Sequence, residues 1–331
     1  MYLVNIGLLW EVGSDRLREN IAALYSNPTV TKDSILTTNG GIVANQIVLQ
    51  ALLSPGNHVI VMYPTYEQLY QTPRMLGAEE NTKMIVLNSP NNPTGAHLSV
   101  EKQQDIIAIA QENDLIIFCD EVFYPLFRLS AKQPPPQSFI DLGYKNIVII
   151  GSLSKAYSLA GTRVGRIAST SKDLLEMTAA MRHYTTISVS QIDEAVAAEA
   201  LADRCRRPLL SRAKEYAETN TTALEKFVDE NSGCCLWVKP VSRNTAMLLF
   251  TRNGRPVDDK ELCLSLLSKY GVLLCPASVC FSDGASLDFQ GYVCVGVAID
   301  KAEMANALCE MRKIMSEDFE NILFAQAYVF S

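Results

Sequence analysis

The sequence lacks the features of several large protein classes. Its 331 residues hold 29 Lys and Arg against 36 Asp and Glu, so no basic excess is available to bind a nucleic-acid backbone. No apolar run approaches the roughly 20 residues that a membrane helix needs. The first residues also have no basic segment ahead of an apolar run, as a secretory signal would. These absences predict a protein with no nucleic-acid or membrane partner.

Patterns for metal ions, disulfides and dinucleotides are missing too. The nine cysteines form no C-x-x-C pair, and His58, His97 and His183 stand apart from one another and from cysteine. We therefore expect no metal site. Many of the cysteines lie inside apolar segments, which favours buried, reduced thiols and a cytoplasmic protein. No G-x-G-x-x-G follows an early strand, which disfavours a dinucleotide-binding enzyme.

What the sequence does contain is a series of short apolar strands separated by helices. Helices are expected from Ser14 to Tyr25, directly after Gly41, and over 99–112. The strands are expected at 58–62, 84–87, 115–119 and 147–151. Strands that are apolar on both faces and alternate with helices are typical of a parallel sheet covered on both sides. We predict an α/β protein with a mostly parallel central sheet.

From about residue 188 the character of the sequence changes. The elements expected there are helices over 190–203, 208–230 and 301–316, and strands near 246–250, 272–275 and 292–298. This pattern is typical of a smaller C-terminal α+β domain that is joined through a long helix. We therefore divide the chain into a first helical segment (1–25), a large domain (26–190) and the long helix with the small domain (191–331).

A lysine with chemical potential follows the last of the predicted apolar strands. Partial burial at a strand end can lower the pKa of an amine, and Lys155 could then form an imine. Ser152, Ser154 and Arg163 lie close to it in the sequence and suit a phosphate group. A lone lysine, however, is usually a solvated surface charge.

Four other segments have side chains or backbone groups that fit the same kind of ligand. Asp120 ends a strand and could pair with a protonated ring nitrogen, although such a residue is often a cap. Asn92, in the turn N-N-P-T-G, could bind a ring hydroxyl. Gly40 and Gly41 open a helix whose free N–H groups favour a phosphate. Tyr66 could stack on an aromatic ring, although tyrosines more often pack in a core.

Together these motifs resemble the fold type I pyridoxal-phosphate-dependent enzymes, specifically the class I/II aminotransferase superfamily. The Gly-rich helix start, P-x-Y, N-P-T-G, D-E and S-x-S-K with a downstream Arg follow in the family's order between about residues 13 and 300. The resemblance implies the family's large-domain fold, pyridoxal 5′-phosphate as cofactor and a small amino substrate. It also implies a homodimer, because the family completes its phosphate pocket across a two-fold interface.

The resemblance also implies a role for each candidate residue. Lys155 would form the Schiff base with the cofactor and move the substrate proton, and Asp120 would keep the pyridine nitrogen protonated. Asn92 would contact the ring hydroxyl and Tyr66 would stack on the ring. The phosphate would be bound by Gly40, Gly41, Ile42, Ser152, Arg163 and, more weakly, Ser154.

Two residue types depart from the family pattern. Where the family usually has a tyrosine after D-E, this chain has Phe123, with Tyr124 one place later and expected to face elsewhere. The family's carboxylate-binding arginine, in a strand such as YVRVGVA, is replaced by Cys294, and a neutral thiol cannot supply that charge. Either Arg243 or Arg74 serves instead, or the substrate is not a free α-amino acid.

Length is a third departure. Compared with the family, few residues precede Gly13, and a strand and a helix are missing between Glu80 and Asn81. Losing a strand would leave an unpaired sheet edge. Both absences favour a truncated remnant that binds pyridoxal phosphate without activity, whereas the retained cofactor residues argue against one.

Aminotransferase chemistry is our first functional hypothesis. A carbon–heteroatom lyase or cyclase of secondary metabolism, on the side branch related to capreomycidine synthase, fits the two replaced residues at least as well. Ser152 and Lys155 also satisfy the S-x-x-K pattern of acyl-serine enzymes, but the K-T-G motif that accompanies it is absent from the sequence.

Overall fold

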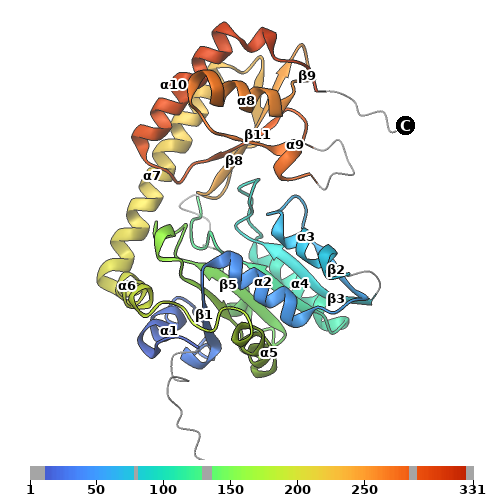
Figure 1. Ribbon diagram of the computed structural model, residues 1–331, viewed down its shortest axis with the longest axis vertical. Coiled ribbons are helices and arrows are strands. Elements are labelled where there is room, and N and C mark those ends of the chain that lie inside the picture. Colours follow the sequence, from blue (N-terminus) through green and yellow to red (C-terminus); the bar gives the residue numbers. More distant parts are fainter. Residues whose placement is uncertain (1–11, 78–80, 129–135, 283–288, 326–331) are drawn as a thin grey trace, which may run out of the picture.

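Two β-sheets organise the chain, and helices cover both of them (Figure 1). The structure is a computed structural model that describes residues 12–77, 81–128, 136–282 and 289–325. The first sheet has six strands in the order β1-β6-β5-β4-β3-β2, and the second has the order β10-β11-β8-β7 with β9 paired to β8. The predicted α/β class is confirmed, with a second, antiparallel sheet in the C-terminal region.

The first sheet is parallel at its centre. Its strands are β1 (Ile35–Thr38), β2 (Asn57–Val61), β3 (Asn81–Asn88), β4 (Ile116–Asp120), β5 (Ile147–Ser152) and β6 (Gly165–Ala168). The pairs β2–β3, β3–β4 and β4–β5 are parallel, whereas β6 runs antiparallel to β5 and to β1. The four apolar strands were predicted. The sequence analysis did not predict β1 and β6, which have four residues each.

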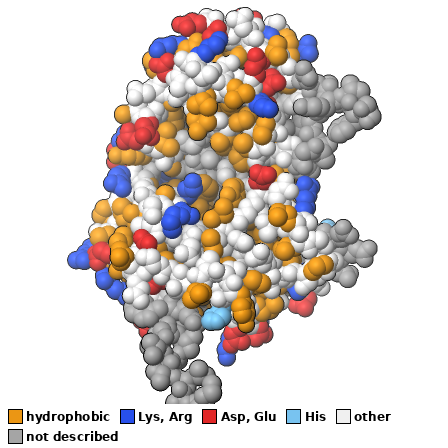
Figure 2. All heavy atoms as spheres, in the orientation of Figure 1, with side chains coloured by type: hydrophobic (Ala, Val, Ile, Leu, Met, Phe, Trp, Pro, Cys, Tyr) orange, Lys and Arg blue, Asp and Glu red, His pale blue; other side chains and the backbone are white. Residues whose placement is uncertain are grey.

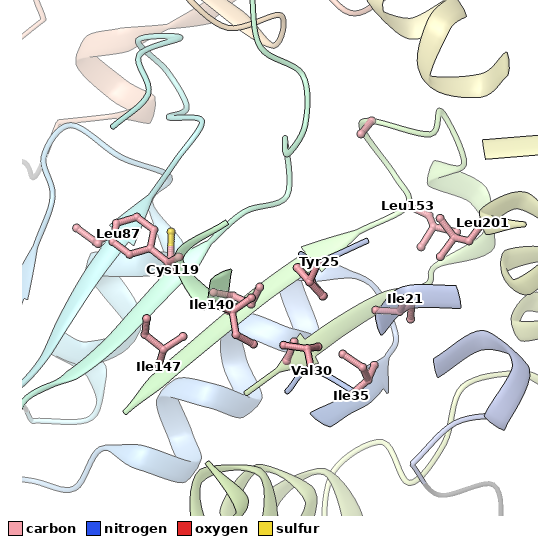
Figure 3. Close-up of a cluster of buried hydrophobic side chains, with 14 of the residues drawn as sticks. Ile21, Tyr25, Val30, Ile35, Leu87, Cys119, Ile140, Ile147, Leu153 and Leu201 are labelled. Atoms are coloured by element: carbon pink, nitrogen blue, oxygen red, sulfur yellow. The ribbon is translucent and has the colours of Figure 1, made fainter. Parts of the chain in front are cut away.

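Helices pack on both faces of this sheet. They are α1 (Asp15–Ala22), α2 (Gly41–Leu52), α3 (Gln68–Met75), α4 (Val100–Glu112), α5 (Lys172–His183) and α6 (Gln191–Leu201). Alternate residues of one strand enter different cores: Phe118 packs with α2, whereas Ile117 and Cys119 pack on the opposite side with α1. Figure 3 shows the core on the α1 side, which includes Ile21 and Ile147. Each such fully buried side chain stabilises the fold by about 1.5–3 kcal/mol.

The second sheet lies above the first in Figure 1. Its strands are β7 (Cys235–Trp237), β8 (Thr245–Arg252), β9 (Arg255–Pro256), β10 (Cys275–Pro276) and β11 (Tyr292–Gly296). The helices of this region are α7 (Asp203–Glu230), α8 (Asp259–Tyr270), α9 (Ala277–Cys280) and α10 (Lys301–Glu317). Short 3₁₀ helices are η2 (Lys32–Ser34), η3 (Phe139–Leu142), η4 (Ala160–Thr162) and η5 (Phe319–Asn321).

Two details of the C-terminal region differ from the sequence prediction. The expected strand at 272–275 is wrong, because residues 272–274 are irregular and β10 begins only at Cys275. The expected break before residue 208 is wrong as well, since α7 continues through Pro208. Packing of α7 against both cores, through Ala213 and Ala217, outweighs the cost of a proline in the helix.

Two further features bear on the sequence predictions. The division at residue 190 stays a prediction. The core on the α1 side of the first sheet extends along the chain to Ala213, and the core of the C-terminal region begins at Ala217.

Strand β2 ends the first sheet, and its Ile60 is 47% exposed, which fits the edge expected from the missing strand. Within the described ranges, every helix is too short or too polar to cross a lipid bilayer.

Candidate active site

A cavity of about 320 Å³ opens where three neighbouring strands of the first sheet end. Asn88, Asp120 and Ser152 are the last residues of β3, β4 and β5, and all three line it. The complete lining is Gly41, Ile42, Asn45, Tyr66, Asn88, Asn92, Asp120, Val122, Phe123, Ser152, Ser154, Lys155, Ala160 and Arg163. All the predicted site residues except Gly40 are among them, and Gly40 directly precedes the lining residue Gly41.

Asp120 is a buried carboxylate at the base of this cavity. It is 3% exposed and accepts hydrogen bonds of 3.0 Å from Asn45 Nδ2 and from the backbone N–H of Val122. Burial raises the pKa of Asp120 to about 6. Within the described residues, no Lys or Arg forms an ion pair with it, and Asn45 Oδ1 has no hydrogen-bond partner. A cation placed in the cavity would therefore stabilise the ionised form.

Lys155 lies on the wall of the cavity. Its Nζ is 5.8 Å from the centre of the Phe123 ring. The expected partial burial is wrong: Lys155 is exposed, because it follows β5 on an open loop. Its amine is accordingly free to reach a ligand that fills the cavity.

One end of the cavity gathers groups that suit an anion. Arg163 donates hydrogen bonds to Ser154 Oγ at 3.4 Å and to the backbone oxygen of Ala160 at 3.0 Å. The N–H of Ser154 donates to Ser152 Oγ at 3.1 Å. Helix α2 begins beside them at Gly41, and its first N–H groups have no partner within the helix.

Gly40 controls how closely Arg163 approaches this helix end. A Cβ at Gly40 would lie 2.5 Å from Arg163 Nη2, so any other residue would displace the guanidinium. Gly40 also has a φ of +85°, which side chains rarely allow. The short distance and the positive φ together explain why a glycine occupies position 40.

An aromatic ring and two amides also line the cavity. Tyr66 is half-buried, and burial and the nearby charge of Asp120 raise its pKa. Asn92 follows β3, and its N–H donates to Asn88 Oδ1 at 2.7 Å. Asn88 in turn donates from Nδ2 to the backbone oxygen of Asp120 at 3.0 Å. These bonds fix the loop that presents Asn92 to the cavity.

The sequence analysis missed four lining residues: Asn45, Asn88, Val122 and Ala160. Two of them had a signal. Asn88 lies at the end of a strand, which is the position that also indicated Asp120. Asn45 lies one helical turn after Gly41, on the same side of α2. Val122 and Ala160 contribute short side chains, and nothing in their sequence context distinguishes them.

Phe123 and the neighbouring Tyr124 have different surroundings. Phe123 lines the cavity, whereas Tyr124 lines a separate cavity together with Lys214 and Arg243. Arg243 is held by Glu218 Oε2 at 3.2 Å and by the backbone oxygen of Phe127.

The two arginines expected to replace the missing guanidinium both lie elsewhere. Arg74 is exposed on α3 and stacks on the Tyr70 ring at 5.6 Å. Neither Arg74 nor Arg243 lines the cavity with Lys155. The alternative that one of them replaces the missing arginine stays a hypothesis.

Comparison with known proteins identifies the family. Residues 74–310 match the model of the family described as aminotransferase class I and II. The chain belongs to this family. It is 30% identical to a PLP-dependent aminotransferase from Streptococcus suis 89-1591, whose crystal structure superposes with a TM-score of 0.82 over 93% of this chain and 83% of that one.

Two curated relatives have different printed activities. The chain is 23% identical to an aspartate aminotransferase of Pyrococcus horikoshii, over 92% of this chain and 81% of the relative. It is 27% identical to the capreomycidine synthase of Streptomyces vinaceus, over 81% of this chain and 72% of the relative. Membership of the family makes this aminotransferase-family enzyme dependent on pyridoxal phosphate.

The described residues fit this cofactor. It carries a phosphate, a protonatable ring nitrogen and an aldehyde, and the cavity offers a counterpart for each. Arg163 and the start of α2 suit the phosphate, the unpaired Asp120 suits a cationic nitrogen, and the exposed Lys155 amine suits the aldehyde. The space that Gly40 leaves open keeps the phosphate end accessible to Arg163.

Proposed function

We propose that this enzyme is an aminotransferase with pyridoxal phosphate in the cavity at the ends of β3, β4 and β5. In the reaction, the amine-bearing carbon of a donor is oxidised by two electrons to a carbonyl. A carbonyl acceptor is reduced by the same two electrons and takes the amino group. The observation that carries the proposal is Asp120, a buried carboxylate without a cationic partner among the described residues, in one cavity with the amine of Lys155.

Each lining residue receives a role in holding the cofactor. Asp120 would keep the ring nitrogen protonated, and Asn45 orients its carboxylate through the 3.0 Å bond. Tyr66 would lie against the ring, and Asn92 would donate to the ring hydroxyl. The phosphate would be bound by Ser152, Ser154, Arg163 and the α2 start at Gly40, Gly41 and Ile42.

Lys155 is the proposed catalytic base. The bound cofactor supplies an electron sink for the bond that breaks at the substrate carbon. Lys155 Nζ would hold the cofactor before the substrate arrives, accept the proton from the amine-bearing carbon and return it later. Phe123 places a ring, and no hydroxyl, near Nζ, so Asn92 would be the side-chain donor to the ring oxygen.

A lyase or cyclase is the second candidate. Phe123 and Cys294 both favour it, because each removes a polar group that the resemblance associates with amino-acid transamination. The similarity to capreomycidine synthase supports the same alternative.

We also propose a homodimer. Ile42, at the cavity, is 49% exposed, and Tyr184, Ile187 and Ile192 are 85%, 58% and 78% exposed. Exposed apolar side chains of this size commonly mark an interface. The mass in solution, measured by light scattering, tests this assembly. A cytoplasmic location stays a prediction from the sequence.

Product analysis tests the reaction type. The protein, loaded with pyridoxal phosphate, is incubated with a panel of amines and amino acids, with pyruvate or 2-oxoglutarate as acceptor. An aminotransferase forms alanine or glutamate in equal amount to the carbonyl product, whereas a lyase releases ammonia without an acceptor. Lys155→Ala should abolish either reaction. A cyclase would convert the amino compound without ammonia and without an acceptor, which mass spectrometry of the mixture detects. Retained cofactor with every amino compound unchanged would support the inactive remnant and contradict our proposal.

A further inference from the structure

A second cavity, of about 520 Å³, lies beside the segment that follows β4. Tyr124 and Phe127 of that segment line it, and Lys214 of α7 and Arg243, which precedes β8, line it as well. This second cavity shares no described lining residue with the cofactor cavity, although Phe123 and Tyr124 are neighbours in the chain. Its volume lies in the range of roughly 300–1,000 Å³ that is typical of sites for small organic molecules.

Carboxylates compensate only part of the positive charge at the second cavity. Glu218 of α7 accepts hydrogen bonds from Arg128 Nη2 at 3.0 Å and from Arg243 Nη2 at 3.2 Å, so one carboxylate serves two guanidinium groups. Lys214 lies one helical turn before Glu218, yet within the described residues no carboxylate forms an ion pair with it. Burial and the charge of Arg243 lower the pKa of Lys214. An anion bound beside the two cations would offset their repulsion.

Asp141 limits the charge that such an anion can carry. It lines the same cavity, and its Oδ1 accepts hydrogen bonds from the backbone N–H groups of Ser26 and Asn27 at 2.8 Å and 2.9 Å. Together with Glu218 it sets two carboxylates against the three basic side chains, which leaves an excess of one positive charge among the described residues. A ligand with one negative charge therefore fits better than a ligand with two.

Apolar side chains make up much of the remaining lining. They are Leu24, Pro125, Pro136 and the rings of Tyr124 and Phe127, whose centres are 5.5 Å apart. Burial and the nearby carboxylates raise the pKa of Tyr124, so its hydroxyl stays protonated at pH 7 and can donate a hydrogen bond. Figure 2 shows Lys and Arg side chains next to hydrophobic ones in the band between the two sheets. A ring or a hydrocarbon chain would bury apolar surface in this cavity.

We propose that the second cavity binds a small organic monocarboxylate with an aromatic or hydrocarbon body. The carboxylate accepts hydrogen bonds from Lys214 and Tyr124 next to the charge of Arg243, and the body packs against Phe127. The bound molecule takes no part in the proposed reaction, because Lys155 lines the other cavity. The site is therefore an accessory one, and it does not depend on which reaction the cofactor supports.

Three matched compounds test the two parts of this proposal. Phenylacetate has a ring and one negative charge, phenylacetamide lacks the charge, and acetate lacks the ring. None of them has an amine that could be transferred. The Kd of each is measured by ligand-observed NMR titration of the protein loaded with pyridoxal phosphate, so that the cofactor cavity is filled. Phenylacetate should bind with a Kd at least about tenfold lower than the Kd of either other compound.

Two lysine variants of α7 sharpen this test. Lys214→Gln should raise the Kd of phenylacetate at least about tenfold and leave the Kd of phenylacetamide unchanged. This variant should fold, because it removes a half-buried cation that has no carboxylate partner among the described residues. Lys226→Gln is the matched control, since Lys226 lies on the same helix with a side chain that is 76% exposed. It should bind phenylacetate like the wild type.

Three results would overturn the proposal. One is a Kd of phenylacetate that is the same in Lys214→Gln and in the wild type, and another is the absence of binding at millimolar concentrations. The third is a Kd that rises in Lys155→Ala and stays unchanged in Lys214→Gln, because the anion would then bind in the cofactor cavity. If the protein takes up no cofactor, the proposed function fails, and the same variants still test the second cavity in the cofactor-free protein.

Discussion

The cofactor cavity and one apolar cluster of the C-terminal region have opposite chemistry. The cavity is formed by strand ends and a helix start of the first sheet, and it gathers Asp120, Lys155 and Arg163. The second, which we call the roof cluster, joins Met247 of β8 and Cys294 of β11 with Ala277 and Phe281 of the α9 region, and it offers methyl, thioether, thiol and phenyl groups. The charged groups that suit the cofactor therefore lie at the strand ends of the first sheet, whereas this part of the C-terminal region contributes apolar groups.

The largest expected effect follows from Asp120→Asn. Activity should fall at least about 100-fold, since an amide cannot hold a ring nitrogen protonated. The cofactor-free protein should, in contrast, become more stable at pH 8. Burial raises the pKa of Asp120 from 3.8 to about 6, so the folded protein favours the protonated acid. The wild-type protein therefore loses stability as the pH rises from about 4 to 6, by on the order of 1–3 kcal/mol.

Urea unfolding of the cofactor-free proteins at pH 4 and pH 8 checks this prediction. The free energy of unfolding of the variant should exceed that of the wild type at pH 8. The two should be equal at pH 4, where the carboxyl group of Asp120 is protonated in most folded molecules. Burial raises the pKa of Glu121 to about 7, so this residue also makes stability depend on pH. Its contribution is the same in both proteins and cancels in the difference between them. A variant that is less stable than the wild type at pH 8 would show that Asp120 stabilises the empty cavity.

Gly40→Ala should weaken the phosphate end of the cavity. Its Cβ would displace the Arg163 guanidinium, and losing a charged hydrogen bond of about 1.5–3 kcal/mol raises the cofactor Kd about 10- to 100-fold. Gly56→Ala is the matched control, because Gly56 has a similar φ of +83° and no atom within 4 Å of the new Cβ. Titration of pyridoxal phosphate measures both. Equal Kd values of pyridoxal phosphate for the two variants would show that Arg163 does not bind the phosphate.

Asn45→Ala should have the smallest effect. The hydrogen bond from Asn45 lowers the pKa of Asp120 and opposes the effect of burial, so its loss raises that pKa further. Cofactor affinity at pH 6 should fall several-fold, by about 1 kcal/mol for one hydrogen bond. The difference should shrink above pH 8, where Asp120 is ionised in both proteins. The cofactor Kd, measured from pH 5.5 to 9, tests this prediction. A loss of cofactor affinity that does not depend on pH would indicate that Asn45 has only a structural role.

The sequence allowed much of the cavity to be predicted, because local rules govern it. Parallel strands end at one edge of the sheet, so residues such as Asp120 and Ser152 were expected to meet. Strands β1 and β6 are only four residues long, too short for a clear apolar pattern. The exposure of Lys155 depends on how open the loop is, which composition does not determine.

The roof cluster could not be predicted in the same way. Met247 and Cys294 are neighbours only because β8 pairs with β11, and their register partners them directly. Alternation along a strand indicates two faces but does not say which one meets another part of the protein. The sequence therefore revealed that the arginine is replaced, whereas the structure was needed to find that Arg74 and Arg243 lie elsewhere.

Borohydride labelling tests the central claim most directly, namely that Lys155 holds the cofactor in the polar cavity. The protein is mixed with pyridoxal phosphate, reduced with borohydride, digested and mapped by mass spectrometry. We predict one cofactor-derived group per chain on the peptide that contains Lys155. Lys155→Ala should carry none, and Lys172→Ala, which removes an exposed lysine of α5, should be labelled like the wild type. A label on another lysine, or one that persists in Lys155→Ala, would contradict the account.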